Sequence, residues 1–156
     1  MKSMEVSKKL VSVLMPVFNA RQFLEASIQS ILNQSYTNFE LLLINDGSTD
    51  DSFSFLQTLS DTRIRLINNE ENIKLIATLN KGIDLCNGEY IVRMDADDIA
   101  FPDRIEKLVE YLDKNPSLAV CGSFYEIFHE DGITQEIQYP INPEDVKVSL
   151  LLYNPI

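Results

Sequence analysis

The sequence predicts one α/β domain over residues 1–156, built on a mostly parallel sheet that is flanked by helices. Short apolar segments alternate along the chain with segments whose apolar residues recur at helical spacing, a pattern typical of strand–helix units. No internal repeat or low-complexity linker interrupts this alternation. With 156 residues, of which 45% are hydrophobic, the chain is long enough to bury a core.

Two strand–helix pairs open the chain. LVSVLMPV (10–17) predicts the first strand, because alternating and β-branched residues run through it and end at Pro16. The segment 21–34 then repeats apolar residues every three to four positions, which predicts a crossover helix. FELLLIN (39–45) predicts the second strand, continuously apolar as strands covered on both faces are. DGSTDDS ends it before a helix that starts at about Asp51.

Two further pairs follow in the middle of the chain. IRLIN (64–68) predicts the third strand, and the apolar spacing of 75–86 predicts a helix that stops near Gly88. EYIVRM (89–94) predicts the fourth strand. Pro102 stands where the next helix begins, since apolar residues recur after it at the positions of one helix face.

The last part of the chain predicts a strand, a hairpin and a helix. SLAVCGSFYEIF (117–128) predicts the fifth strand, EDGIT (130–134) a turn and EIQYP (136–140) the returning strand. NPEDVKVSLLLY (142–153) predicts a helix whose start carries proline and acidic residues. No closing element follows this helix, so we expect a domain that is truncated at its C-terminus.

Composition excludes some classes of function. The net charge of −11 and the pI of about 4.4 argue against nonspecific binding to nucleic acid or to anionic membranes, because both need a positive surface. No apolar run approaches the roughly 20 residues of a membrane-spanning helix. Cys86 and Cys121 lack the spacing of metal ligands, which favours small core residues in a reducing cytoplasm.

Three segments that carry polar residues lie at the ends of predicted strands. They are Pro16 to Asn19, Asp46 to Asp50, and Asp95 to Asp98. In an open parallel sheet, ligands bind outside the carboxyl ends of the strands. We therefore expect these three segments to meet at one site.

The acidic segment predicts a metal site. Adjacent carboxylates repel one another unless a cation or several donors compensate. Mg²⁺ and Mn²⁺ take oxygen ligands, often one or two carboxylates together with substrate phosphates. A diphosphate completes such a site, which favours nucleotide-sugar chemistry. The alternative is a solvated acidic loop in which Asp98 caps the next helical turn.

Two residues are candidates for contact with a nucleobase. Phe18 can stack on a base, and Asp46 can accept a hydrogen bond from a base N–H. Each has an alternative reading: Phe18 as a core residue, and Asp46 as part of a tight Asp-Gly turn.

The motifs VSVLMPVFNA, LLLINDGSTDDS and TLNKGIDLCNGEYIVRMDADDIAFPDRIEKL occur in an order and spacing that resemble the family 2 glycosyltransferases. The resemblance runs from about Val11 through Ser123 and more loosely to the end. It implies the Rossmann-like GT-A fold and transfer of a sugar from a nucleoside-diphosphate sugar, usually a UDP-sugar. The transfer would proceed with inversion, by in-line attack of an acceptor hydroxyl.

The resemblance also implies roles for individual residues. Pro16, Phe18 and Asn19 match the family's P-x-Y-N element, whose aromatic residue contacts the base, and Asp46 matches the aspartate that recognises it. Asp95 and Asp97 match the D-x-D motif that meets the ribose and the metal-diphosphate. Asp97 is the first choice as ligand of Mn²⁺ or Mg²⁺, then Asp95, with Asp98 a weaker candidate.

The chain departs from the family pattern at two places. Lys74 replaces a common glycine and Leu79 a frequent arginine, so the donor contact of that arginine is not expected here; Lys74 and Lys81 could supply charge or be solvated. No acidic motif resembles the family's general base, which we expect outside this chain. His129, the only histidine, is expected at the surface.

The resemblance implies a biological setting. Related chains build surface polysaccharides, which predicts a glycan or lipid-linked acceptor and a cytoplasmic protein close to the inner membrane face. A nucleotide-sugar-binding module without turnover is the alternative function. A phospho-acceptor receiver domain is disfavoured, because the acidic pair it needs after the first strand is missing.

Overall fold

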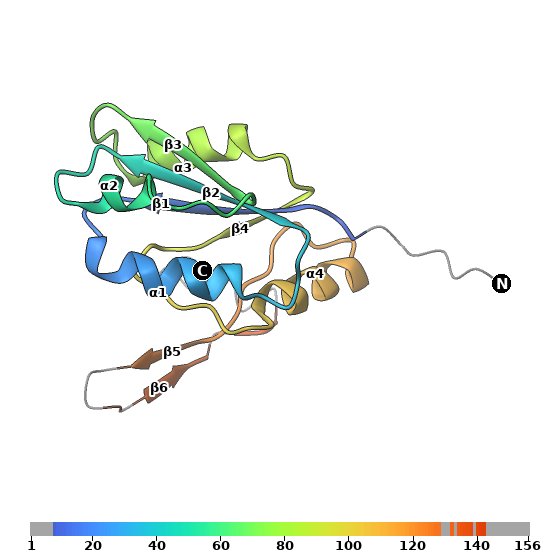
Figure 1. Cartoon of the computed structure of the whole chain (residues 1–156). Coiled ribbons are helices and arrows are strands. Elements are labelled where there is room, and N and C mark those ends of the chain that lie inside the picture. Colours follow the sequence, from blue (N-terminus) through green and yellow to red (C-terminus); the bar gives the residue numbers. More distant parts are fainter. Residues whose placement is uncertain (1–7, 129–131, 133, 139, 143–156) are drawn as a thin grey trace. The chain divides into compact units, whose positions relative to one another are not determined.

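Four parallel strands form the central sheet of the computed structural model, which describes residues 8–128, 132, 134–138 and 140–142. The strands are β1 (Val11–Val17), β2 (Phe39–Asp46), β3 (Ile64–Asn69) and β4 (Tyr90–Arg93), in the spatial order β3-β2-β1-β4. All four carboxyl ends lie at the same edge of the sheet (Figure 1). The mostly parallel sheet predicted from the sequence is confirmed.

Helices cover both faces of this sheet (Figure 1). They are α1 (Arg21–Leu32), α2 (Ser52–Leu56), α3 (Leu75–Leu85) and α4 (Arg104–Lys114). The larger core lies between one sheet face and α1 with the first part of α4, where α1 contributes Leu24, Ile28 and Ile31. Alternate residues of β1 and β2 point into it, as the period of a strand requires.

A smaller core lies between the other sheet face and α3. Leu14, Leu42 and Ile44 form it, with Leu79, Leu85 and Cys86 packed against them. Gly82 is the point of closest approach, since a Cβ atom there would lie 2.3 Å from Leu14 Cδ1. Burial raises the pKa of the Cys86 thiol, as expected for a core cysteine.

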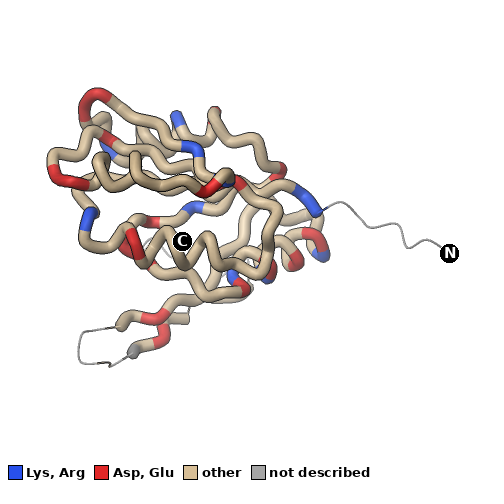
Figure 2. The backbone as a smooth tube through the Cα atoms, in the orientation of Figure 1, with Lys and Arg blue, Asp and Glu red and all other residues tan. Residues whose placement is uncertain are grey.

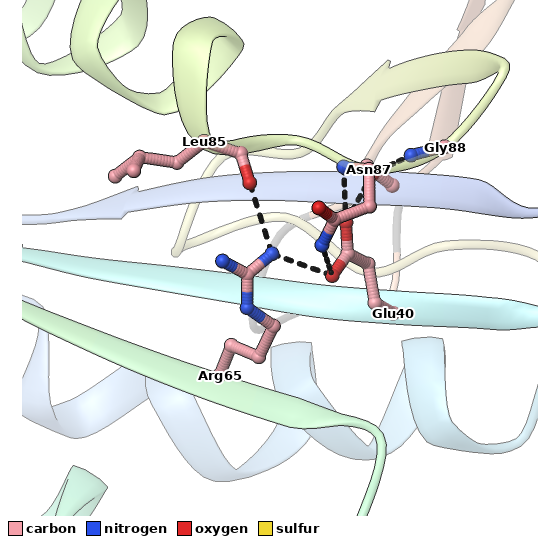
Figure 3. Close-up of polar contacts among 6 residues, drawn as sticks. Glu40, Arg65, Leu85, Asn87 and Gly88 are labelled. Carbon is pink, nitrogen blue, oxygen red and sulfur yellow. Dashed lines mark hydrogen bonds and ion pairs between the residues drawn. The ribbon is translucent and has the colours of Figure 1, made fainter.

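A polar network fixes the connection between α3 and β4 at the amino ends of the strands (Figure 3). Glu40 Oε2 accepts hydrogen bonds from Arg65 Nη1 at 2.6 Å and from Asn87 Nδ2 at 2.9 Å. Its Oε1 accepts from Ser12 Oγ and from the Asn87 backbone N–H. Burial by itself raises the pKa of Glu40, but these hydrogen bonds outweigh it and lower the pKa to about 2.

The described residues from Glu110 onward belong to a second compact unit, and they correct one prediction. β5 (Tyr125–Phe128) is shorter than the predicted strand 117–128 and pairs antiparallel with β6 (Thr134–Ile137). Residues 117–124 are irregular, so the prediction of a strand there was wrong. Apolar composition does not make a strand unless a neighbouring backbone supplies hydrogen bonds.

The antiparallel return predicted after EDGIT is confirmed, but β6 begins at Thr134 and ends at Ile137, whereas the predicted strand was 136–140. The helix predicted at 142–153 lies outside the described residues, apart from its first residue, and so does His129.

Candidate functional site

Two adjoining hollows open at the carboxyl ends of β1, β2 and β4. The first, about 230 Å³, is lined by the end of β1, the β1–α1 connection, Leu75, and the segment from Asp95 to Asp97. The second, about 280 Å³, is lined by the end of β1, Asp46, Asn72, Lys74 and Leu75. The three polar segments predicted to meet after the strands are therefore brought together.

Phe18 belongs to both hollows. Its side chain is 48% exposed, so it is not a core residue. Pro16 also lines both hollows and comes from β1 itself, which gives this edge a rigid base. An exposed ring beside two hollows is available for stacking against a planar ligand.

Asn19 ties the β1–α1 connection to the loop after β2. Its Oδ1 accepts hydrogen bonds from the backbone N–H groups of Thr49 (2.8 Å) and Asp50 (3.3 Å). Asn19 has a φ of +50°, a conformation that asparagine tolerates better than most residues. The side chain therefore shapes the hollow that it lines.

Asp50 and Ser52 complete this link at the start of α1. Asp50 Oδ2 accepts from the Arg21 backbone N–H at 3.2 Å, and Ser52 Oγ accepts from the Ala20 N–H at 3.0 Å. The first turn of α1 contains no acidic residue, and Ala20 at the N-cap makes no side-chain capping bond. The loop after β2 thus supplies the capping groups that the helix lacks.

Asp46 lines the second hollow and is only 3% exposed. Its Oδ1 accepts hydrogen bonds from Asn69 Nδ2 at 2.9 Å and from the Ile73 backbone N–H at 3.0 Å. Burial raises the pKa of Asp46, yet the surrounding donors lower it more, so the net shift is downward. The carboxylate is held ionised, which makes it a hydrogen-bond acceptor only.

Sequence reasoning missed the residues that hold Asp46. Asn69 is its register partner on β3, 6% exposed, and Lys81 Nζ donates to Asn69 Oδ1 at 2.6 Å. Thr78, fully buried on α3, accepts from Asn69 Nδ2 at 3.5 Å. The available signal was the position of Asn69 at the carboxyl end of the third strand, next to that of Asp46. Lys81 is exposed, as its solvated reading implies, and its ammonium also donates to Asn69.

The backbone at Lys74 is strained. Its φ of +76° and ψ of +156° lie in a region occupied almost only by glycine, the residue that the family pattern has there. Asn72 Oδ1 accepts from the Lys74 backbone N–H at 2.9 Å. Gly47, with a φ of +66°, packs against this segment, since a Cβ atom there would lie 2.6 Å from Asn72 N. The wall of the second hollow is thus tightly fixed.

The carboxylates of the acidic segment, residues 95–98, differ in their partners and in their surroundings. Asp95 forms an ion pair with Arg93, whereas Asp97 is exposed and makes no hydrogen bond or ion pair within the described residues. Burial, with the negative charges of Asp95 and Asp97, raises the pKa of Asp98, and Asp98 lines neither hollow.

These carboxylates fit a metal that arrives with its phosphates. No three His, Cys, Asp or Glu side chains form a ready-made metal cluster in the part of the chain that the structure describes. Asp97 offers free carboxylate oxygens at the first hollow. A hard divalent cation that keeps phosphate and water ligands needs no more than one or two such groups.

Cations are scattered over this part of the molecule. Within residues 8–109, lysines and arginines lie on several elements and are not gathered at one side (Figure 2). Positive charge beside the hollows therefore comes from single side chains, of which Lys74 lines the second hollow.

The sequence comparison decides the family. The model of "Glycosyl transferase family 2" matches residues 12–151. The chain belongs to this family. Its fold is the GT-A fold, as the resemblance implied.

Two relatives illustrate the match. An uncharacterized glycosyltransferase of Haemophilus influenzae is 45% identical over 158 residues, covering 94% of this chain and 49% of the relative. The Escherichia coli UDP-Glc:alpha-D-GlcNAc-diphosphoundecaprenol beta-1,3-glucosyltransferase WfgD is 32% identical over 145 residues, covering 93% and 56%. The chain thus spans about half the length of these relatives.

Solved structures share the fold. TarS 1-349 of S. aureus, in complex with UDP, superposes with a TM-score of 0.61 at 20% identity, covering 68% of this chain and 32% of the TarS 1-349 chain. The mannosyltransferase PcManGT of Pyrobaculum calidifontis, in complex with GDP-Man and Mn²⁺, gives a TM-score of 0.62 at 24% identity, covering 69% of this chain and 33% of the PcManGT chain.

Within the described residues, no helix has the length and apolar character needed to cross a membrane.

Proposed function

We propose that this chain is the donor-binding part of an inverting, metal-dependent glycosyltransferase that takes its sugar from a nucleoside-diphosphate sugar, UDP-sugar being the first choice. One observation carries the proposal: two hollows share Phe18, and one contains the buried acceptor Asp46 while the other contains the free carboxylate of Asp97. A nucleoside-diphosphate sugar needs both: a buried acceptor for its base and a free carboxylate for the cation on its diphosphate.

The second hollow is proposed to take the nucleoside. Phe18 stacks on the base, over the floor that Pro16 provides, and Asp46 accepts a hydrogen bond from a base N–H. Asn19 acts on the nucleotide through the shape of its loop, because its amide oxygen is already bound to the backbone of residues 49 and 50.

The first hollow is proposed to take the diphosphate and its cation. Asp97 is the first ligand for Mn²⁺ or Mg²⁺, Asp95 the second once its pair with Arg93 opens, and Asp98 a weaker one. A bound cation supplies charge stabilisation for the leaving diphosphate. PcManGT, which shares the fold, was solved with GDP-Man and Mn²⁺, and this supports a divalent cation here.

The acceptor is proposed to be a glycan or a lipid-linked saccharide, and the place of reaction the cytoplasmic side of a membrane. WfgD, named for a diphosphoundecaprenol-linked acceptor, supports this class of acceptor. The general base is proposed to lie outside this chain. That the relatives are named glycosyltransferases favours an enzyme over a binding module without turnover.

Thermal unfolding tests the donor site. The chain is heated with UDP, GDP, dTDP or CDP, each with and without Mn²⁺. Ligand at a hundred times its dissociation constant stabilises a protein by about 2.7 kcal/mol, which is measurable. We expect a shift with UDP that depends on the metal. No shift with any nucleotide would refute the donor site, and an equal shift without metal would refute the role of the cation.

A further inference from the structure

We infer that Lys81 selects the base of the donor from outside the pocket, by fixing Asn69 and through it Asp46. The inference rests on the proposed function, because it concerns the same nucleotide site. Lys81 is an exposed residue of α3, and neither hollow is lined by it. It acts on the base through two other side chains, so it is a positioning residue.

The three side chains form a continuous chain of short contacts. Lys81 Nζ lies 2.6 Å from Asn69 Oδ1, and Asn69 Nδ2 lies 2.9 Å from Asp46 Oδ1. Asn69 is 6% exposed and Asp46 is 3% exposed, so water competes little with the inner contact. The outer end reaches solvent at Lys81.

The orientation of the Asn69 amide between Lys81 and Asp46 follows from which groups can donate a hydrogen bond. A lysine ammonium can only donate, so the amide oxygen of Asn69 has to face Lys81 and its NH₂ group has to face Asp46. Thr78 Oγ1 receives the same NH₂ group at 3.5 Å. Without Lys81, the Asn69 amide could turn over, which would bring its carbonyl oxygen against the carboxylate of Asp46.

This orientation determines which bases the site accepts. An ionised Asp46 accepts a hydrogen bond from a ring N–H, which uracil, thymine and guanine carry next to a carbonyl group. Cytosine has an unprotonated ring nitrogen at the same position, and only a protonated Asp46 could donate to it. By keeping Asp46 a pure acceptor, Lys81 discriminates against cytidine nucleotides, because a mismatched base leaves polar groups unpaired.

The first test compares three lysine variants of the full chain. Lys81→Met removes the charge at similar length, Lys81→Arg keeps a donor-only cation, and Lys107→Met is the control on an exposed lysine of α4. Dissociation constants are measured calorimetrically for UDP, GDP, dTDP and CDP with Mn²⁺. We expect Lys81→Met to lose roughly tenfold in affinity for the preferred nucleotide and to reduce its preference over CDP, and Lys81→Arg to retain both.

A double-mutant cycle separates positioning from a general structural effect. If Lys81 acts through Asp46, Lys81→Met should have no further effect on nucleotide affinity in an Asp46→Asn background. Additive losses, or unchanged selectivity in Lys81→Met, would overturn the inference while leaving the proposed function in place. If the wild-type chain binds none of the four nucleotides, the proposed function fails first, and the inference fails with it.

Discussion

Arg93 and Asp95 form a two-pronged ion pair, in which Arg93 Nε donates to Asp95 Oδ1 and Nη2 donates to Oδ2, both at 3.0 Å. Both carboxylate oxygens of Asp95 are therefore engaged. Asp97, two residues further on, makes no such contact in the part of the chain that the structure describes. The two aspartates of the D-x-D motif are thus unequal, and Asp97 is the one ready to bind a cation.

Asp97→Ala should abolish the metal-dependent part of nucleotide binding and leave the fold intact, because the side chain is exposed and supports no neighbour. The measurement is the shift of the unfolding temperature with UDP, with and without Mn²⁺. Asp103→Ala is the control, since the Asp103 carboxylate lies outside both hollows and forms a surface ion pair with Lys107. An unchanged Mn²⁺-dependent shift in Asp97→Ala would remove the metal role from this residue.

Asp46→Ala should weaken binding of the preferred nucleotide roughly tenfold or more and reduce its selectivity over the other bases, because a charged acceptor is lost from a buried position. Binding by the wild type should persist at pH values below the ordinary range of aspartate, since the pKa of Asp46 is lowered. Calorimetric titration over pH measures both effects. Asp51→Ala is the control: its side chain makes no capping bond. Equal selectivity in Asp46→Ala would contradict the assignment.

The positions of the acidic residues at the site could be predicted from the sequence. Asp46, Asp95 and Asp97 could be predicted because each follows a recognisable strand, and parallel strands bring their carboxyl ends together. The exposure of Phe18 could not be predicted, since an aromatic residue after a strand packs inward as readily as it faces solvent.

The sequence holds one cue to the support of Asp46, the place of Asn69 at the end of the third strand, and no cue that points to Lys81. Asn69 and Lys81 are separated from Asp46 by 23 and 35 positions, and each resembles an ordinary polar residue of a strand end or a helix surface. Only the register of β2 with β3, and the packing of α3 on the sheet, bring them together. The strand predicted at 117–128 was too long for a related reason. It was predicted from local apolar composition alone, and residues 117–124 have no neighbouring strand to pair with among the described residues.

Glu40→Gln should lower the free energy of unfolding near pH 7 and flatten its dependence on pH in acid. The folded-state pKa of Glu40 is lowered from 4.5 to about 2, so its contribution is present above pH 4.5 and is lost as the pH falls toward about 2. The difference corresponds to roughly 3 kcal/mol. Urea unfolding from pH 7 to pH 2 measures it, with the exposed Glu25→Gln as control. Parallel pH curves for wild type and Glu40→Gln would contradict this role.

Lys74→Gly should stabilise the fold, against the usual effect of introducing glycine. The strain of a side chain at φ +76° and ψ +156° is about 1 to 3 kcal/mol, whereas the extra freedom of glycine in the unfolded chain costs about 0.5 to 1 kcal/mol. The net gain should be about 1 kcal/mol, seen as a higher midpoint in urea unfolding. Lys74→Ala separates backbone from side chain, because alanine keeps the Cβ atom and should bring no such gain. If both variants are stabilised equally, the effect comes from removing the lysine charge, and the backbone at residue 74 is not strained.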